Sequence, residues 1–266
     1  MKLNKVYCMD NLELLQKLPN ESIDLIYCDI LYNTGKKFKD YDDKLGTPQE
    51  AMEWYKPRLV EMKRVLKDTG SIYLQCDWHL NSYIRILMDE IFGYKMFLDE
   101  IIWKYTTGGS SKKYFSRKHD TIYHYSKTKE YTYNLIKEKS YVDKSKGYNP
   151  YTKKYQDEKG EYVLVYPRDV WDIPYLNMHD KTNRVGYDTQ KPKKLMERII
   201  KSSSNKGDVV ADFFCGSGTS MVVAKELGRQ YIGCDINPRA VEITNDRLNK
   251  VITNNQILFK LGEVYE

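Results

Sequence analysis

The sequence predicts an α/β fold built on a doubly wound, mostly parallel sheet. Short apolar runs of strand length alternate with helical patterns before residue 97 and again after residue 192. A glycine turn, Gly216-Ser217-Gly218, joins one of these runs to a helix. Ligands of such sheets bind at the carboxyl ends of the strands, so we expect a site there.

The predicted elements follow from the spacing of the apolar residues. Strands are expected at 5–9, 23–28, 71–76, 97–105, 120–125, 209–211 and 230–234, and helices at 12–18, 47–67, 80–92, 193–200, 221–227 and 239–248. Thr47 is expected to cap its helix, with Pro48 in the first turn and Glu50 completing a capping box. No helical pattern separates 97–105 from 120–125, which predicts an antiparallel pair at the edge of the sheet.

The charge distribution favours nucleic acid as a partner. The chain has 43 Lys and Arg against 37 Asp and Glu, and residues 104–206 alone hold 23 basic and 12 acidic residues. The same middle part carries 14 of the 24 tyrosines. This composition is typical of a nucleic-acid surface, although a lysine-rich solvated surface has it too.

Other features of the composition exclude some classes of protein. No apolar run reaches the ~18 residues of a membrane span, and the N-terminus lacks the apolar core of a signal peptide. We therefore expect a cytoplasmic protein without a membrane segment. The five cysteines stand singly, and the four histidines lack metal-ligand spacing, so no disulfide and no metal site is predicted.

Aspartates follow five of the predicted strands. They are Asp10, Asp29, Asp77, Asp212 and Asp235. Unpaired buried charges cost several kcal/mol, so five carboxylates at one rim indicate a ligand site, although each alone also suits a turn or a cap. The glycine turn lets the backbone approach a ligand, and the helix after it offers free N–H groups. An acid at the position of Asp235 suits the two hydroxyls of a ribose.

Four motifs resemble those of the S-adenosylmethionine-dependent amino-methyltransferases of DNA. Asp29-Ile30-Leu31-Tyr32, followed by Asn33-Thr34-Gly35, stands where that family has Asp-Pro-Pro-Tyr after a strand. Asp212-x-Phe214-x-Gly216-Ser217-Gly218-Thr219 resembles the cofactor motif, and Thr189-Gln190-Lys191-Pro192 the segment before it. The order of the motifs is similar to that of the β group, which includes many adenine-N6 enzymes. Ile30 and Leu31 replace both prolines of the family motif.

The resemblance implies a Rossmann-like methyltransferase domain with a target-recognition insertion. Residues 1–126 are then the catalytic half, 127–187 the insertion and 188–266 the cofactor-binding half of the same domain. The implied cofactor is S-adenosylmethionine, and the implied substrate is double-stranded DNA with the target base flipped out. A homodimer and a restriction endonuclease counterpart are open expectations.

The resemblance also assigns the site residues. Asp29 and the carbonyl of Ile30 would accept the hydrogens of an exocyclic amine, and Tyr32 would stack on the base. Cofactor contacts are implied for Asp10, Asn11, Asp29, Lys191, Asp212, Phe213, Phe214, Gly216, Ser217, Gly218, Thr219 and Asp235. Asp212 would bind the ammonium group of the cofactor, and Asp10 and Asn11 would read its adenine edge. A helix cap at Asn11 and a surface lysine at Lys191 are the alternatives.

DNA contacts are implied for the loop between 97–105 and 120–125. The candidates are Tyr32, Phe115, Arg117, Lys118 and His119, with edge-strand packing as the alternative for Phe115 and His119. Phosphate contacts are expected from Lys112, Lys113, Lys118, Lys153 and Lys154, with a merely solvated side chain as the alternative for each.

The resemblance favours methyl transfer to adenine N6 of DNA, because the family more often has Ser than Asp in its cytosine-N4 enzymes. A cytosine-N4, RNA or small-molecule methyltransferase and a catalytically silent DNA-binding subunit are the alternatives. A nicotinamide dehydrogenase fits poorly, because the turn lacks the third glycine of the dinucleotide fingerprint.

Overall fold

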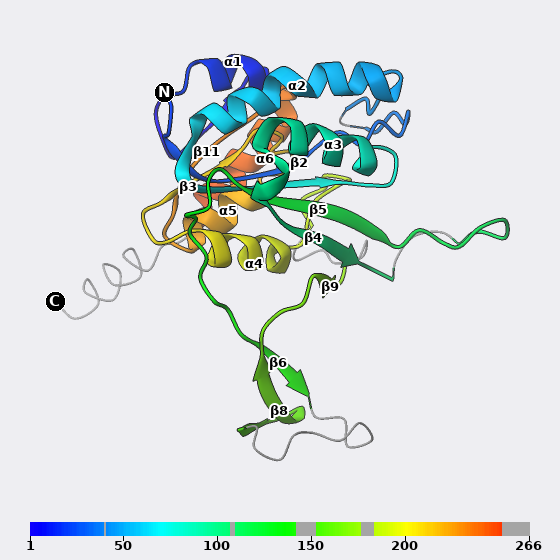
Figure 1. The fold of residues 1–266 in the computed structure, drawn as a ribbon, viewed down its shortest axis with the longest axis vertical. Coiled ribbons are helices and arrows are strands. Elements are labelled where there is room, and N and C mark those ends of the chain that lie inside the picture. The colour runs from blue at the N-terminus through cyan, green and yellow to red at the C-terminus, as the bar shows by residue number, and fades with distance from the viewer. Residues whose placement is uncertain (40, 107–109, 142–152, 177–183, 252–266) are drawn as a thin grey trace.

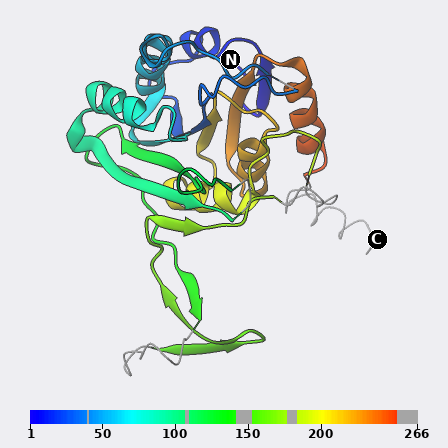
Figure 2. The same cartoon turned by 90° about the vertical axis from the view of Figure 1, so that its right-hand side faces the viewer.

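In the computed structural model of the chain, the main body is an eight-stranded sheet with helices on both faces (Figures 1 and 2). The structure describes residues 1–39, 41–106, 110–141, 153–176 and 184–251. In spatial order the strands are β1 (Lys5–Cys8), β11 (Gln230–Asp235), β10 (Val209–Asp212), β2 (Ile23–Asp29), β3 (Leu66–Cys76), β5 (His119–Ser126), β4 (Phe97–Lys104) and β9 (Val170–Asp172). Of these eight described strands only β5 runs antiparallel to its neighbours, so the predicted fold class is confirmed.

Helices bury an apolar layer on each face of the sheet. One face packs against α1 (Asn11–Gln16), α2 (Pro48–Val65) and α3 (Asn81–Phe92), and the other against α4 (Lys193–Ser203), α5 (Thr219–Glu226) and α6 (Pro238–Asn249). Successive strand residues point to opposite faces. Ile26 and Cys28 of β2 therefore join the first layer, while Leu25 and Tyr27 join the second. The capping box predicted at Thr47 starts α2.

The chain leaves β2 and β10 in opposite directions along the sheet. From β2 it crosses through α2 to β3, and from β10 it crosses through α5 to β11. Neighbouring strands whose connections diverge leave a crevice at their carboxyl ends, which is where ligands of such sheets bind. The five predicted rim aspartates stand at the carboxyl ends of β1, β11, β10, β2 and β3, which are adjacent and parallel. Their placement at one rim is confirmed.

The antiparallel pair, β5 with β4, is not at the edge of the sheet as predicted. β9 pairs with β4 and takes the outermost place. The sequence does not reveal β9 because three residues are too few for a periodic signal. Trp171 of β9 is nevertheless buried, and it packs in the same apolar layer as Trp103 of β4.

A second, three-stranded antiparallel sheet extends away from the body (Figures 1 and 2). It consists of β6 (Glu138–Tyr141), β8 (Gly160–Val165) and β7 (Lys154–Asp157), with β8 in the middle.

A short 3-10 helix, η1 (Tyr94–Met96), leads into β4. In the described part of the chain, no helix has the length and apolar character needed to cross a membrane.

Candidate active site

A cavity of about 1170 Å³ opens at the carboxyl rim of the sheet, between the ends of β2 and β10. All five rim aspartates line it. Small-molecule pockets usually measure ~300–1,000 Å³, so this cavity is large enough for a ligand of cofactor size. Of the residues predicted to contact the cofactor, Gly218 alone is absent from the described lining of the cavity.

The glycine turn is folded tightly between β10 and α5. Gly216 and Gly218 have φ of +47° and +71°, which side-chain-bearing residues adopt at a cost. A Cβ on Gly218 would lie 2.1 Å from Thr244 of α6, so this glycine serves the packing of the turn against α6. The Asp235 carboxylate accepts the Gly216 N–H at 2.8 Å and fixes the turn from the next strand.

Asp212 is buried at the start of the same turn. One carboxylate oxygen accepts the Phe214 N–H at 3.0 Å, and the other accepts the Ser220 hydroxyl. Burial raises the pKa of Asp212 to about 7, even though both hydrogen bonds lower it. Burial also raises the pKa of Asp235. Negative charge is therefore poorly solvated at this side of the cavity, and a cationic group of a bound ligand would stabilise the ionised carboxylates.

Asp10 and Asn11 lie at the far end of the rim and are bound together by Arg58 of α2. Asp10 caps α1 through the Leu12 N–H at 2.8 Å and pairs with Arg58 at 3.0 Å. Asn11 accepts from Arg58 at 2.6 Å and donates to the Phe213 carbonyl at 3.2 Å. Asp10 is thus the helix cap, and Asn11 connects α1 to the glycine motif. Arg58 is distant in sequence and carries no motif, so sequence reasoning missed it.

Asp29, at the carboxyl end of β2, forms a buried ion pair with Lys191. The alternative of a surface role for Lys191 is therefore wrong, because its side chain is 8% exposed. Burial raises the pKa of Asp29, while the Lys191 ammonium opposes the rise. Burial alone would lower the pKa of Lys191, but Asp29 reverses this and raises it above its usual range.

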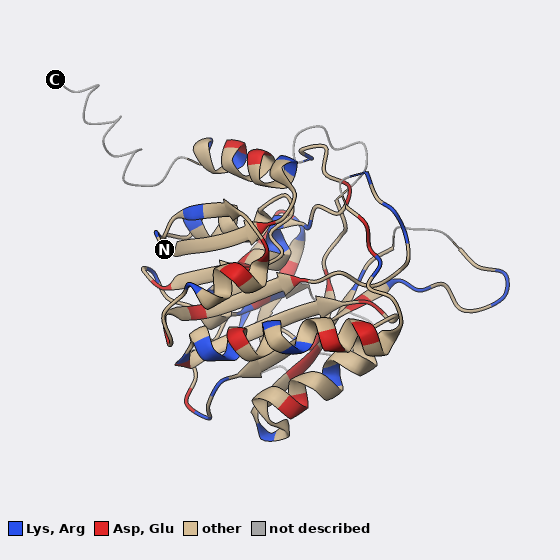
Figure 3. Ribbon diagram, turned by 90° about the horizontal axis from the view of Figure 1, so that it is seen from above, with Lys and Arg blue, Asp and Glu red and all other residues tan. Residues whose placement is uncertain are grey.

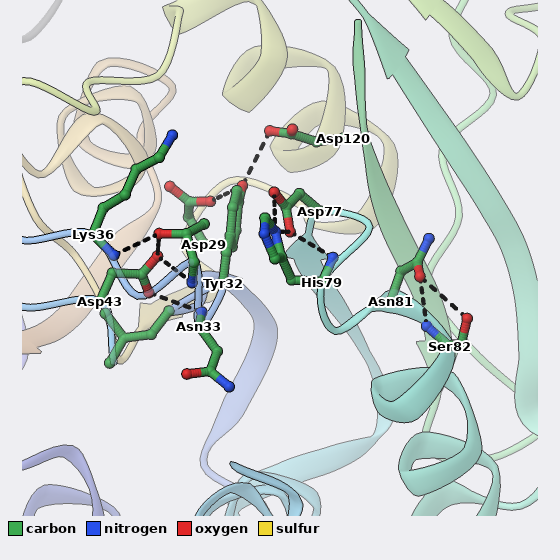
Figure 4. A network of polar contacts seen from close by, with 12 residues as sticks. Asp29, Tyr32, Asn33, Lys36, Asp43, Asp77, His79, Asn81, Ser82 and Asp120 are labelled. Carbon is green, nitrogen blue, oxygen red and sulfur yellow. Dashed lines mark hydrogen bonds and ion pairs between the residues drawn. The ribbon is translucent and has the colours of Figure 1, made fainter. Parts of the chain in front are cut away.

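Tyr32 stands between two carboxylates (Figure 4). Its hydroxyl lies 2.6 Å from an oxygen of Asp29 and 3.1 Å from an oxygen of Asp120. Gln75 donates to both the Tyr32 hydroxyl and Asp120, at 3.1 and 2.8 Å. A phenol has one hydrogen, so it serves one carboxylate at a time.

Aromatic side chains form the wall beyond Tyr32. Tyr105 and Tyr175 line the cavity and meet edge-on at 5.7 Å, and Tyr175 stacks on Trp103 at 5.6 Å. The Tyr105 hydroxyl donates to Asp120 at 2.9 Å. None of these four residues was a predicted site residue. Tyr105 and Asp120 flank the predicted DNA loop, which is the one signal in the sequence that points to them.

The predicted DNA loop projects from the sheet between β4 and β5, with basic residues along it (Figure 3). Phe115 is 98% exposed, so edge-strand packing is wrong for it, and His119 is exposed at the start of β5. Arg117 stacks over Trp78 at 3.7 Å and over Tyr114 at 4.5 Å. Trp78 directly follows the rim residue Asp77, so the loop is anchored beside the cavity. Lys112 and Lys113 are exposed on this loop, and Lys118 is half-buried there. Lys153 and Lys154 are exposed at the start of β7 in the second sheet.

The variant Asp212→Asn tests the buried carboxylate. The folded chain keeps the Asp212 proton up to about pH 7, whereas the unfolded chain releases it near pH ~4. The folded state binds more protons between these values, so the free energy of unfolding of the wild type should fall with rising pH by a few kcal/mol relative to Asp212→Asn.

Urea unfolding of both proteins from about pH 4 to about pH 7 measures this difference. The exposed Asp246→Asn is the matched control and should follow the wild type. A constant gap between the wild type and Asp212→Asn over the whole range would contradict the assignment.

Comparisons with known proteins agree with this geometry. The family model described as DNA methylase matches residues 23–246. The type II methyltransferase M.HpaI of Haemophilus parainfluenzae is 35% identical over 246 residues, covering 92% of this chain and 74% of that protein. The DNA adenine methyltransferase YhdJ of Escherichia coli K12 is 34% identical over 255 residues, covering 90% and 81%.

Solved structures share the fold at lower identity. The cytosine-N4-specific PvuII DNA methyltransferase superposes with a TM-score of 0.67 at 18% identity, covering 96% of this chain and 94% of that one. A complex of M1.HpyAVI with S-adenosylmethionine gives a TM-score of 0.58 at 21% identity, covering 92% and 99%. The chain therefore belongs to the DNA methylase family of S-adenosylmethionine-dependent enzymes, and both the predicted family and the predicted cofactor are confirmed.

Proposed function

We propose that this DNA methylase transfers the methyl group of S-adenosylmethionine to the exocyclic N6 of a flipped-out adenine. The observation that carries the proposal is the placement of Asp29, Ile30 and Tyr32 against the same cavity as the glycine turn. An aspartate at position 29 and the similarity to an adenine-specific relative support adenine over cytosine.

The lining of the cavity suits this cofactor. S-adenosylmethionine carries a sulfonium and an ammonium group, and the rim offers five carboxylates. Asp212 is buried and Asp235 is half-buried, and neither has a lysine or arginine within ion-pair distance among the described residues, so a cationic ligand would complement them. The glycine turn and the N-terminus of α5 would hold the methionine part, and Asp235 the ribose hydroxyls.

The chain's own residues would prepare the base. An exocyclic amine on a purine is a poor nucleophile, and acceptors for its two hydrogens improve it. The Asp29 carboxylate keeps acceptor capacity beside its bonds to Tyr32 and Lys191, and the Ile30 carbonyl is the second acceptor. The nitrogen would gain the methyl group and lose a proton, and Asp29 would accept that proton. The cofactor supplies the activated methyl group.

The loop between β4 and β5, beside the cavity, would contact the DNA duplex. An exposed aromatic and a stacked arginine bind nucleic acid through base stacking and phosphate contact. Phe115, Arg117, Lys118 and His119 remain the proposed contacts, and Trp78 and Tyr114 join them through Arg117. The similarity to type II methyltransferases supports a restriction endonuclease counterpart.

Asp29→Asn should reduce methyl transfer by at least ~10²-fold, because it removes the charge that accepts the amine hydrogen. The side chain keeps its shape, so the cofactor Kd should stay within a few fold. The matched control is Asp24→Asn, because Asp24 lies on the same strand, pairs with Lys67 and does not line the cavity. Transfer of tritiated methyl groups to duplex DNA, followed by nucleoside analysis, gives both the rate and the modified base.

Three results of this assay would contradict the proposal in different ways. Label on cytosine contradicts the choice of adenine. Near wild-type transfer by Asp29→Asn contradicts the role of Asp29. Absence of label with wild-type protein that binds the cofactor normally favours a catalytically silent DNA-binding subunit.

Phe115→Ala combined with Arg117→Ala should weaken duplex binding by about tenfold or more and leave the cofactor Kd unchanged, because stacking is worth ~1–3 kcal/mol per base. The loss of one phosphate-binding charge should also lower the salt slope of binding by about one. Tyr94→Ala is the control, since Tyr94 is an exposed aromatic near Arg85 at the opposite end of β4. Fluorescence anisotropy at several salt concentrations measures all three proteins. Equal losses for the control and the loop variant would contradict a specific role of the loop.

A further inference from the structure

The turn from Asp29 to Tyr32 lacks the two prolines of the motif it resembles, yet its backbone is held at several points. Proline fixes φ and restricts the residue before it, whereas Ile30 and Leu31 leave both free. A misplacement of about 1 Å at a reacting group can cost ~10²-fold in rate. The turn therefore needs another source of rigidity.

We propose that Tyr55, Asp43 and Asp120 are positioning residues that hold this turn by hydrogen bonds in place of the prolines. The inference rests on the proposed roles of Asp29, Ile30 and Tyr32 in methyl transfer. Each positioning residue is buried, and each comes from a different segment: Tyr55 from α2, Asp43 from the loop before it and Asp120 from β5.

The middle of the turn is held from both sides. The Tyr55 hydroxyl donates to the Leu31 carbonyl at 2.8 Å, and the Tyr55 ring is 1% exposed. On the other side, the Ile30 N–H donates to the Gln75 carbonyl at 3.2 Å. A proline at position 30 has no N–H and would lose this bond to β3. Isoleucine thus gives the turn a backbone contact that the proline motif lacks.

The residues after Tyr32 are held by Asp43, which is 2% exposed (Figure 4). Its carboxylate accepts the N–H groups of Asn33 and Thr34, each at 3.0 Å, and also the Thr34 hydroxyl. Asn33 has a φ of +58°, a region that is unfavourable for residues with a side chain. Its side chain accepts the Leu45 N–H at 2.7 Å and donates to the Gly46 carbonyl at 2.9 Å, which offsets that cost.

The ring of Tyr32 is held through its hydroxyl. Asp120 and Asp29 lie on either side of it, and Gln75 donates to both the hydroxyl and Asp120. The Tyr27 hydroxyl in turn donates to the Gln75 side chain at 2.7 Å. A stacking surface alone needs only the ring face, so these bonds to the hydroxyl set the orientation of the ring relative to Asp29.

Tyr55→Phe and Asp120→Asn test the proposal, with Tyr125→Phe as the matched control. The control also removes a buried tyrosine hydroxyl, which donates to Asp89 at 2.6 Å and does not line the cavity. We expect each test variant to lower the single-turnover rate of methyl transfer about tenfold, with the cofactor Kd within twofold of wild type. The control should keep the wild-type rate.

A rescue experiment separates positioning from general stability. Leu31→Pro restores one constraint of the family motif and keeps the Ile30 N–H bond to Gln75. It should raise the rate of Tyr55→Phe severalfold towards that of the wild type and leave Asp120→Asn slow.

Three results would overturn the proposal. They are wild-type rates for Tyr55→Phe and Asp120→Asn, an equal loss in Tyr125→Phe, and failure of Leu31→Pro to raise the rate of Tyr55→Phe. Full activity of Asp29→Asn would instead refute the proposed function itself. Inactivity of Asp29→Asn beside normal rates for the test variants would refute only the positioning role.

Discussion

The buried ion pair between Lys191 and Asp29 joins the two parts of the chain that build the cavity. Asp29 ends β2, and Lys191 lies two residues before α4. An unpaired charge at either position would be strongly destabilising, so each residue fixes the place of the other. The pair also opposes the rise in the pKa of Asp29 that burial causes, and it thereby favours the ionised form of this carboxylate.

The remaining polar groups of the cavity divide into two sets around this pair. On the β10 side, Asp212 and Asp235 fix the glycine turn, and their carboxylates are the groups proposed to meet a cationic cofactor. On the β5 side, Asp120 and Gln75 hold Tyr32 beside Asp29. The divergent connections of β2 and β10 bring the two sets within one cavity, so the topology of the sheet places the proposed cofactor side and the proposed base side next to each other.

Much of this arrangement could be predicted from local sequence signals. Apolar periodicity located the strands and helices of the main body, and strand-end aspartates located the rim. Motif resemblance then assigned Asp29 and the glycine turn to one site. These signals succeed because each is carried by one short stretch of consecutive residues. The three residues of β9 are too few to show an apolar period.

The contacts that hold the site together could not be predicted in the same way. Asp120 meets Tyr32 only because β5 inserts between β3 and β4, and the order of strands is not encoded in any single segment. Asp43 is one of three acidic residues in a polar loop, and nothing in its neighbours distinguishes it from Asp40 and Asp42. Arg58 and Tyr55 lie in α2. The apolar period of this helix predicts which of its faces is buried, but it does not predict which residues that face contacts.

The most direct test of this account is the pH dependence of single-turnover methyl transfer in Lys191→Met, measured at saturating cofactor. If Lys191 keeps Asp29 ionised, its removal raises the pKa of Asp29 further, and the acid limb of the rate profile moves to higher pH. The rate of Lys191→Met should then approach that of the wild type only in alkaline buffer. An acid limb at the same pH in both proteins would contradict the central role of the ion pair.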